Sequence, residues 1–215
     1  ERIWDTNSFA QFSFNHTINK FTTLNQGKYS FYRTHYVNND DKQIKIDNLY
    51  KQREVYFSSA NMYSFLPELK ASASYDSLDA NVYGFAKPTR QTHMLSLAAA
   101  YHLDWIKLQA SGLATYIHDA LDGQEAPSDK FVFTPAVIMA IHPFKSKDFS
   151  FRLFYKKSFR MPTFNDLYYA DMGNSKLNPE HVTQYNVGML YEHQSPERFF
   201  TNLRFSVDTY YNKVK

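Results

Sequence analysis

The sequence predicts an all-β protein, an antiparallel up-and-down meander that forms part of a transmembrane β-barrel. Three observations support this prediction. Apolar and polar residues alternate with period two in about ten segments. The connections between these segments are alternately short and long along the whole chain. Aromatic residues make up 18% of the 215 residues, so apolar side chains are spread thinly over a large surface, as in a barrel wall.

The ten predicted strands are defined by alternation and by the polar segments between them. They cover residues 8–17, 21–36, 51–64, 69–78, 92–101, 105–117, 131–142, 149–159, 181–193 and 199–212. The long connections between them are 37–50, 77–91, 118–130 and 160–180, and each is flanked by short ones. A soluble sandwich has no reason to alternate in this way, whereas a barrel has tight turns on one side of the membrane and long loops on the other.

The last predicted strand shows two chemically different faces. One face carries Phe199, Thr201, Leu203, Phe205, Val207, Thr209 and Tyr211, and the other carries Asn202, Arg204, Ser206, Asp208 and Asn212. The segments 105–117 and 149–155 divide in the same way, with Lys107 and Arg152 on the polar face. We expect the first face to meet lipid and the second to line a hydrated lumen or to contact a polar plug.

Five aromatic residues lie beside the predicted short turns. They are Tyr101, Trp105, Phe149, Tyr191 and Phe199. A barrel places an aromatic girdle at this level of the membrane. The alternative is that they are core aromatics of a sandwich.

Two predicted strands are less regular. Pro135 lies inside 131–142 and removes a backbone donor, which indicates a bulge or an edge position. The segment 92–101 is rich in Leu and Ala and would suit a helix if taken alone. Its place in the alternating series favours a strand.

Composition excludes several classes of protein. The net charge of +3 and the scattered Lys and Arg residues argue against nucleic-acid binding. Cysteine is absent, so disulfides and thiolate metal sites are excluded. No apolar run is long enough for a transmembrane helix. Since the chain starts without Met or a signal-peptide pattern and ends just after a strand, we expect a piece of a longer protein.

The most informative stretch runs from Ser158 to Gly188. It reads Ser-Phe-Arg-Met-Pro-Thr-Phe-Asn-Asp-Leu-Tyr-Tyr from residue 158, then Gly-Asn from residue 173, Leu-Asn-Pro-Glu from residue 177 and Tyr-Asn-Val-Gly from residue 185. This string resembles the TonB-dependent outer-membrane receptor family. In that family, a strand ending in Phe-Arg-x-Pro-Thr-Phe-Asn-(Asp/Glu)-Leu-Tyr-Tyr is followed by a Gly-Asn-x-x-Leu-x-Pro-Glu turn and the next barrel strand.

The resemblance implies that residues 1–215 are a partial receptor barrel domain, with the plug and the remaining strands outside it. It implies active uptake of a large, scarce nutrient such as a ferric siderophore, cobalamin or haem. An enzyme is not expected, because the sequence offers no pairing of a nucleophile with a base. It also implies a bacterial outer-membrane location. The expected partners are the lipid bilayer, a small ligand such as a metal chelate, and the TonB complex acting through the plug; nucleic acid is not expected.

Residue chemistry explains the motif independently of any family. Pro162 should end regular pairing near Arg160, and Pro179 should end the irregular backbone just before the next strand. Gly173 and Asn174 suit a tight turn. The segment is interpreted either as a rigid loop that closes a hairpin or as one that faces the ligand or a plug.

The candidate ligand-facing residues of this loop come from residue chemistry together with the resemblance. They are Arg160, Asp166, Tyr168, Tyr169 and Asn174. Arg160 and Asp166 are expected to form an ordering ion pair. The two tyrosines are expected to present aromatic faces to a large ligand at the extracellular mouth.

Clustered carboxylates give one candidate metal site. Asp119, Asp122 and Glu125 lie on a predicted long loop, and carboxylate oxygens are the ligands that Ca²⁺ prefers. The spacing does not match an EF-hand, so an ordinary solvated loop is the alternative. The eight histidines are dispersed, and catalytic motifs such as Gly-x-Ser-x-Gly are absent.

Two other functions fit the pattern of strands. The first is a different membrane barrel, such as a porin-like channel or an adhesin, without active transport. The second is a soluble β-rich module such as a carbohydrate-binding sandwich. The motif argues against the first, and the short–long alternation with inward Lys107, Arg204 and Asp208 argues against the second.

Overall fold

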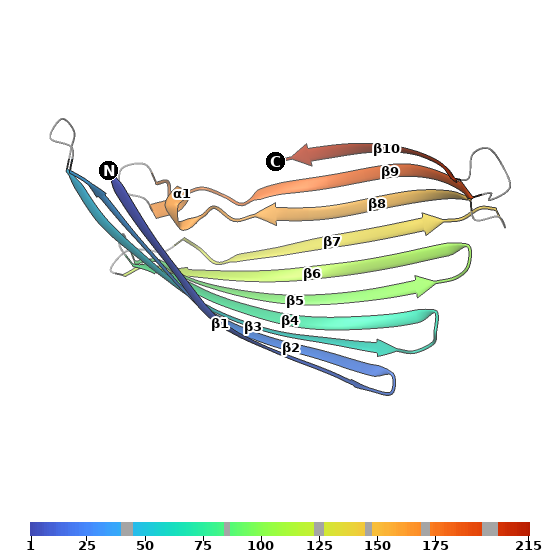
Figure 1. The fold of residues 1–215 in the computed structure, drawn as a ribbon, viewed down its shortest axis with the longest axis horizontal. Helices are drawn as coiled ribbons and strands as arrows, with labels where there is room; N and C mark the ends of the chain where they lie inside the picture. The colour runs from blue at the N-terminus through green and yellow to red at the C-terminus, as the bar shows by residue number, and fades with distance from the viewer. Residues whose placement is uncertain (40–44, 84–86, 123–126, 145–147, 169–172, 195–201) are drawn as a thin grey trace.

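The computed structural model describes residues 1–39, 45–83, 87–122, 127–144, 148–168, 173–194 and 202–215. For residues 79–83 it describes the backbone and not the side chains. Ten strands form one antiparallel sheet, in which each strand pairs with its neighbours in the sequence (Figure 1). The strands are β1 (Arg2–Ile18), β2 (Phe21–Asn38), β3 (Ile46–Ser64), β4 (Leu69–Tyr83), β5 (Thr89–His102), β6 (Ile106–Ala120), β7 (Lys130–Ile141), β8 (Phe149–Arg160), β9 (Glu180–Gln194) and β10 (Asn202–Val214). The short helix α1 (Phe164–Tyr168) lies between β8 and β9.

The predicted meander is confirmed, and the strands are longer than predicted at the end that carries the long connections. β1 begins at Arg2, β3 at Ile46, and β4 continues to Tyr83. These extensions were missed because they are short and interrupted by Asp and Asn residues, which weakens the period-two signal. The long connections therefore shrink to 39–45, 84–88, 121–129 and 161–179, and the short–long alternation remains.

The strand register confirms the predicted faces for the described residues; Phe199 and Thr201 lie outside them. One row of directly opposite residues on the outer face crosses the whole sheet and is apolar or aromatic: Ile18, Phe21, Tyr63, Ala71, Ala99, Ala110, Val137, Tyr155, Tyr185 and Tyr211. The adjacent row on the inner face is largely polar: Thr17, Thr22, Met62, Ser72, Ala98, Ser111, Ala136, Lys156, Gln184 and Asn212. Large apolar side chains of the outer face are exposed, including Phe12 at 59% and Leu97 at 60%.

Two glycines make room for side chains of neighbouring strands. A Cβ on Gly27 would lie 2.1 Å from the ring of Phe12, so the glycine lets this aromatic ring cover β2 from β1. A Cβ on Gly188 would lie 2.2 Å from an oxygen of Asp208. Gly188 thereby allows Asp208 of β10 to reach over β9 and pair with Arg152 of β8 at 3.0 Å.

Pro135 lies at a local strand edge, as predicted. β7 pairs with β6 from Lys130 to Ile141, but it pairs with β8 only from Ala136 onward. Residues 130–135 of β7 and 157–160 of β8 therefore diverge, and Pro135 needs no donor on that side. This wedge opens toward the loop that carries α1 (Figure 1).

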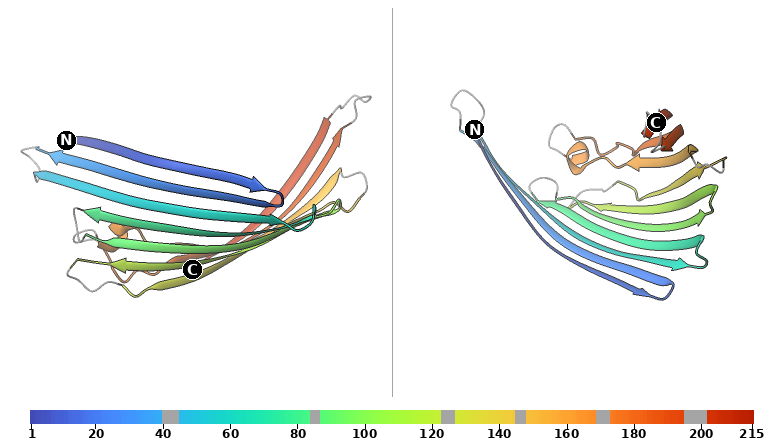
Figure 2. Two further views of the ribbon diagram at one scale, coloured as in Figure 1. Left: turned by 90° about the horizontal axis from the view of Figure 1, so that it is seen from below. Right: turned by 45° about the vertical axis from the view of Figure 1, so that its right-hand side comes forward.

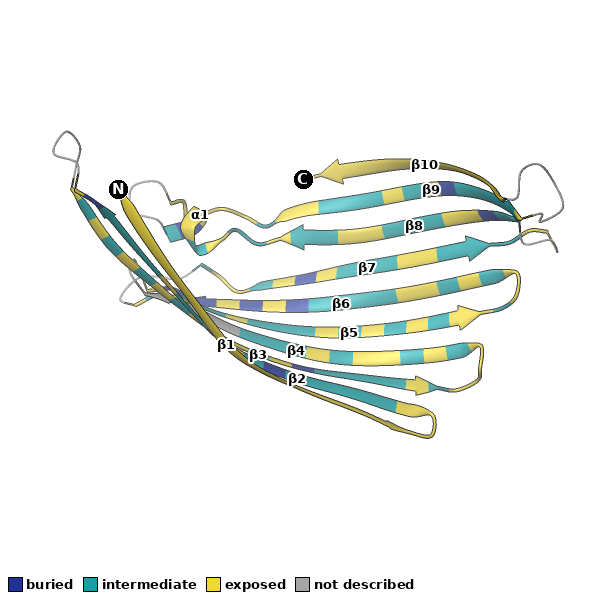
Figure 3. Cartoon of the chain, viewed as in Figure 1, coloured by how far each residue is buried: buried dark blue, intermediate teal, exposed yellow. Residues whose placement is uncertain are grey.

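The sheet is curved, and α1 lies on its concave side (Figure 2). Few side chains of the described residues are buried, and β1 and β10 are exposed along their whole length (Figure 3). The described residues contain no second sheet that would cover either face, so the sandwich alternative is wrong. Among the described helices, none has the length and apolar character needed to cross a membrane.

Candidate ligand-binding site

The helix α1 is held by a reciprocal cap at its first turn. Asp166 accepts hydrogen bonds from the backbone N–H and the hydroxyl of Thr163, both at 2.8 Å. In return, the backbone N–H of Asp166 donates to the Thr163 hydroxyl at 3.2 Å. This is the capping-box arrangement, which satisfies donors that a helix start leaves unpaired.

Arg160 acts on this cap only at a distance. The hydrogen bonds from Thr163, and secondarily the positive charge of Arg160, hold the pKa of Asp166 below its ordinary value. The carboxylate is engaged by Thr163, and the predicted direct ion pair with Arg160 is not formed. Arg160 ends β8 opposite Glu180 of β9. The predicted ion pair between Arg160 and Asp166 is therefore corrected. The hydrogen bonds between Thr163 and Asp166 order the start of the loop.

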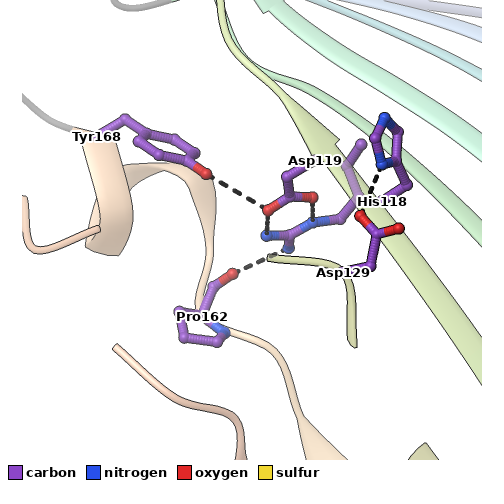
Figure 4. Close-up of polar contacts among 6 residues, drawn as sticks. His118, Asp119, Asp129, Pro162 and Tyr168 are labelled. Atoms are coloured by element: carbon purple, nitrogen blue, oxygen red, sulfur yellow. Dashed lines mark hydrogen bonds and ion pairs between the residues drawn. The ribbon is translucent and has the colours of Figure 1, made fainter. Parts of the chain in front are cut away.

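Arg90 of β5 joins the motif loop to the sheet through Asp119 and Pro162, and these two residues are labelled in Figure 4. Its guanidinium donates two parallel hydrogen bonds, each 2.7 Å, to the carboxylate of Asp119 on β6. Its third nitrogen donates to the carbonyl of Pro162 at 3.0 Å, and its charge lies 4.9 Å from the centre of the Phe164 ring. Since the side chains of Arg90 and Asp119 are only 14% and 6% exposed, this fork is shielded from water and strong. It fixes the start of the loop over the inner face.

Tyr168 closes the same network from the end of α1. Its hydroxyl donates to the second oxygen of Asp119 at 3.4 Å (Figure 4). Burial first, and then the negative charge of Asp119, raises the pKa of Tyr168 to about 12. The phenol therefore stays protonated and keeps donating at every physiological pH.

An apolar contact holds the opposite side of the helix. Leu167 is 4% exposed, and with Ile117, Met161 and Leu177 it lines a small space beside the wedge between β7 and β8. Ile117 is 3% exposed. α1 is thus anchored by a polar contact through Tyr168 and by an apolar contact through Leu167, so its position on the sheet is well defined.

A cavity of about 760 Å³ lies between α1 and the inner face of β2–β5. Its lining consists mainly of aromatic rings and neutral polar groups, with two basic residues. The lining residues are Tyr32, Thr34, Tyr36, Ile46, Asn48, Tyr50, Lys51, Gln52, Leu78, Arg90, Thr163, Phe164 and Asn165. The amide of Asn48 donates to the hydroxyl of Tyr50 at 3.0 Å. A cavity of this size and mixed character suits a drug-sized ligand.

The four predicted ligand-facing residues that the structure describes are not among those that line this cavity. Tyr168 supports Asp119, and Asp166 caps α1. Asn174 shapes the following turn, because its side-chain oxygen accepts from the backbone N–H of Lys176. Tyr169 lies outside the described residues. Direct contact of these residues with a ligand therefore stays a prediction.

The tyrosines of β2 and β3 were missed from the sequence. Tyr32, Tyr36 and Tyr50 occupy inward positions close to the long connections. Their spacing could have indicated that they face inward. Each of the three has an even residue number, whereas the outward residues of β2 and β3 have odd numbers. Tyr50 was also hidden because β3 was expected to begin after it.

The structure gives two of the candidate calcium ligands cationic partners. Asp119 lies in β6 and not in a loop, and it pairs with Arg90. Asp122 pairs with Lys87 at 3.3 Å. Glu125 lies outside the described residues. The described part of the chain holds no group of three metal-ligating side chains, so calcium binding stays a prediction that these contacts do not favour.

The carboxylate at the end of the same loop is also occupied. Asp129 accepts hydrogen bonds from the hydroxyl of Tyr116 and from the ring of His118, the latter at 2.8 Å. These bonds, that of Tyr116 first, lower the pKa of Asp129. They tie the start of β7 to β6 (Figure 4).

Comparison with known proteins identifies the barrel. A family model described as "TonB dependent receptor-like, beta-barrel" matches residues 2–215. A comparison with curated protein sequences gives no match.

Several solved structures share the fold at low sequence identity. The copper transporter OprC superposes with a TM-score of 0.70 at 11% identity over 98% of this chain and 38% of its own. The ferric-catecholate import receptor Fiu from E. coli K12 superposes with a TM-score of 0.62 at 11% identity, over 98% of this chain and 44% of its own. The third structure is a double mutant of the Serratia marcescens hemophore receptor HasR in complex with its hemophore HasA and heme. It superposes with a TM-score of 0.56 at 13% identity, over 99% of this chain and 43% of its own. The chain thus spans less than half the length of these structures.

Proposed function

The chain belongs to the TonB-dependent receptor-like β-barrel family, and from that premise we propose that it forms part of the wall and ligand vestibule of a receptor for active nutrient uptake across a bacterial outer membrane. The observation that carries this proposal is the cavity of about 760 Å³ on the concave face, beneath a loop that is rigidly anchored by Arg90. A binding site on the inner face of a barrel, close to its long loops, is placed to receive a ligand from outside the cell.

The cavity chemistry favours a bulky chelate with planar or aromatic faces. Tyr32, Tyr36, Tyr50 and Phe164 supply ring surfaces, and Asn48 supplies neutral polar groups. Two charged residues belong to the lining: Arg90, which is neutralised by Asp119, and Lys51. Rings stack well on planar ligands, and a single cation such as Lys51 can compensate only a small negative charge. Ferric siderophores and haem fit this description; cobalamin and copper complexes remain in the same class.

The expected partners follow from the same proposal. The exposed apolar outer face meets lipid, and the largely polar inner face contacts water and a plug, through which TonB would deliver energy. The inward Arg152–Asp208 pair, with each side chain 45% exposed, is suited to such a hydrated interface.

An uptake assay tests the proposal. The whole receptor is expressed in a host that lacks its own uptake systems, and entry of a labelled ferric catecholate, haem and Cu(II) is measured with and without energised TonB. We expect saturable, TonB-dependent uptake of one of these probes. Uptake that rises linearly with concentration and ignores TonB would instead show a passive porin-like channel.

A further inference from the structure

Two side chains of β2 that line the concave cavity donate hydrogen bonds to carboxylates. The hydroxyl of Thr34 donates to Asp5 at 2.7 Å, and the phenol of Tyr36 donates to Glu1 at 2.9 Å. Asp5 is the direct ladder partner of Thr34, so both lie on the same face of the sheet. A hydroxyl has one proton and two lone pairs. Because the protons are committed to carboxylates, Thr34 and Tyr36 offer a ligand acceptor oxygens.

The lining has the same polarity on β3 and on α1. The side-chain amide of Gln52 donates to Glu54 at 2.5 Å, and the hydroxyl of Thr163 donates to Asp166 at 2.8 Å. Gln52 and Thr163 both line the cavity. One donor of the Gln52 amide is thereby committed, and its carbonyl oxygen is an acceptor. This part of the cavity wall is therefore rich in hydrogen-bond acceptors.

Negative charge predominates behind this wall. In the described part of the chain, Glu1, Asp5 and Glu54 form no ion pair with Lys, Arg or His. Of the two basic lining residues, Arg90 is already paired with a carboxylate of β6, and only Lys51 remains to balance these three carboxylates. A cationic ligand group would reduce this imbalance, whereas an anionic group would increase it.

Aromatic rings add a third feature that favours a cation. Tyr32 and Tyr36 line the cavity, and a cation within about 6 Å of a ring centre is attracted to the ring face. The same contact occurs within the protein on this face of β2, where the ammonium group of Lys28 lies 5.3 Å from the centre of the Phe9 ring. Lys28 is not among the lining residues, so the cavity rings stay available to a ligand.

We propose that the cavity binds its ligand through a cationic nitrogen group, such as a primary ammonium, that points toward β1–β3. An ammonium group can donate three hydrogen bonds, and it finds acceptor oxygens on Thr34, Tyr36 and Gln52. The carboxylates behind these side chains supply the compensating charge. The inference rests on the proposed function, because it takes the cavity as the ligand site. It narrows the ligand to chelates that carry such a group.

The test measures binding of an aromatic amine to the whole purified receptor in neutral detergent. The probe is dansylcadaverine, a fluorophore with a primary amine, and its N-acetylated form is the neutral comparison. Fluorescence anisotropy is read against receptor-free micelles, which corrects for partition into detergent. We expect the amine to bind about tenfold more tightly than the acetylated probe, with an affinity that falls as salt screens the charges. Equal binding of the two probes, or binding of neither, refutes the proposal.

Two isosteric variants assign the preference to the carboxylates. Asp5→Asn and Glu54→Gln remove the charge but keep an oxygen that accepts from Thr34 and from Gln52. We expect each to weaken binding of the amine about threefold and the double variant about tenfold, with the acetylated probe unaffected. If the double variant binds the amine as wild type does, the proposal is wrong.

The matched control is Asp76→Asn. Asp76 accepts a hydrogen bond from Tyr56 at 2.8 Å and lies opposite Ser58 on the same concave face, but neither Asp76 nor Tyr56 lines the cavity. Binding of the amine should change less than about twofold. A loss as large as that of the double variant would show that the general negative charge of the face attracts the amine, which also refutes the proposal.

Failure of this inference is distinguishable from failure of the proposed function. The uptake assay reports transport, and the probe assay reports the polarity of the cavity. A receptor that takes up a labelled chelate with energised TonB but binds both probes alike refutes the cationic group alone. A receptor that prefers the amine but shows no TonB-dependent uptake refutes the transport proposal alone.

Discussion

Arg90 makes three different kinds of contact within the site: a fork to Asp119, a hydrogen bond to Pro162 and a cation–π contact with Phe164. Its removal would leave Asp119, which is 6% exposed, as an uncompensated buried charge. Breaking a buried pair in this way typically costs about 3–5 kcal/mol. The loop start would then lose its hydrogen bond from the sheet, because Arg90 donates to the Pro162 carbonyl.

We therefore expect Arg90→Gln to weaken ligand binding by the receptor at least tenfold and to speed protease cleavage within 161–168. Arg90→Lys should recover only part of the affinity, because an ammonium group cannot reproduce the fork. Equilibrium binding and limited proteolysis measure both effects.

The matched control is Lys87→Gln. Lys87 pairs with Asp122 near the same end of the sheet, but the two side chains are 62% and 71% exposed. Exposed pairs contribute little, so binding and proteolysis should stay close to wild type. Equal losses in both variants would show that general loss of positive charge, and not the anchor, is responsible.

Tyr168 gives a prediction about pH. Its pKa is raised from 10.0 to about 12 in the folded protein, so the neutral phenol is favoured on folding. The stabilisation is fully present below pH 10.0 and is lost as the pH rises toward about 12. The difference between the near-ultraviolet titrations of wild type and Tyr168→Phe should therefore show one tyrosine that ionises near pH 12. A difference curve centred at the ordinary value would contradict the buried hydrogen bond to Asp119.

At the scale of elements, Gly188 allows β8 and β10 to interact across β9. Gly188→Ala should push Asp208 away from Arg152 and destabilise the folded receptor by about 1 kcal/mol, the upper range for a half-exposed pair. The expected signature is non-additivity: once Asp208→Ala has removed the carboxylate, Ala at position 188 should cost little more. Thermal unfolding of the two single variants and the double variant measures this. Additive losses would show that Gly188 is needed for another reason.

The strand centres could be predicted from the sequence, and the strand ends could not. Period-two alternation marks the part of each strand that has one apolar face, as in 149–155. Beyond that part, in Ile46–Tyr50 or Asp79–Tyr83, the segments are short and include Asp and Asn residues, so the alternation is too weak to predict pairing. Pro162 and Pro179 predicted the ends of the loop correctly, because proline restricts the backbone locally.

The candidate site was only partly predictable for a related reason. The motif loop was recognised, but its anchor depends on Arg90, which lies 72 positions away from Pro162 in the sequence. Contacts of this kind are set by the curvature of the sheet and leave no local signature. The same holds for Tyr32, Tyr36 and Tyr50, which approach Phe164 only because β2 and β3 curve over the concave side.

For the whole molecule, the curved sheet separates two environments with different tasks. Exposed apolar rows on the convex face suit lipid, and polar rows with an anchored loop on the concave face suit a ligand. The division runs residue by residue along each strand, so neighbouring side chains of one strand serve different functions. Tyr29 and Tyr32 of β2 are an example: the first is an exposed tyrosine of the convex face, and the second lines the cavity.

If the concave cavity beneath α1 receives the ligand, truncation of these two tyrosines should have different effects on ligand binding. The measurement is equilibrium binding of the imported chelate to the purified receptor, compared for wild type, Tyr32→Ala and Tyr29→Ala. We expect Tyr32→Ala to weaken binding about tenfold, equivalent to about 1.4 kcal/mol, and Tyr29→Ala to leave it within twofold. Equal affinities of the two variants would contradict a ligand site in this cavity.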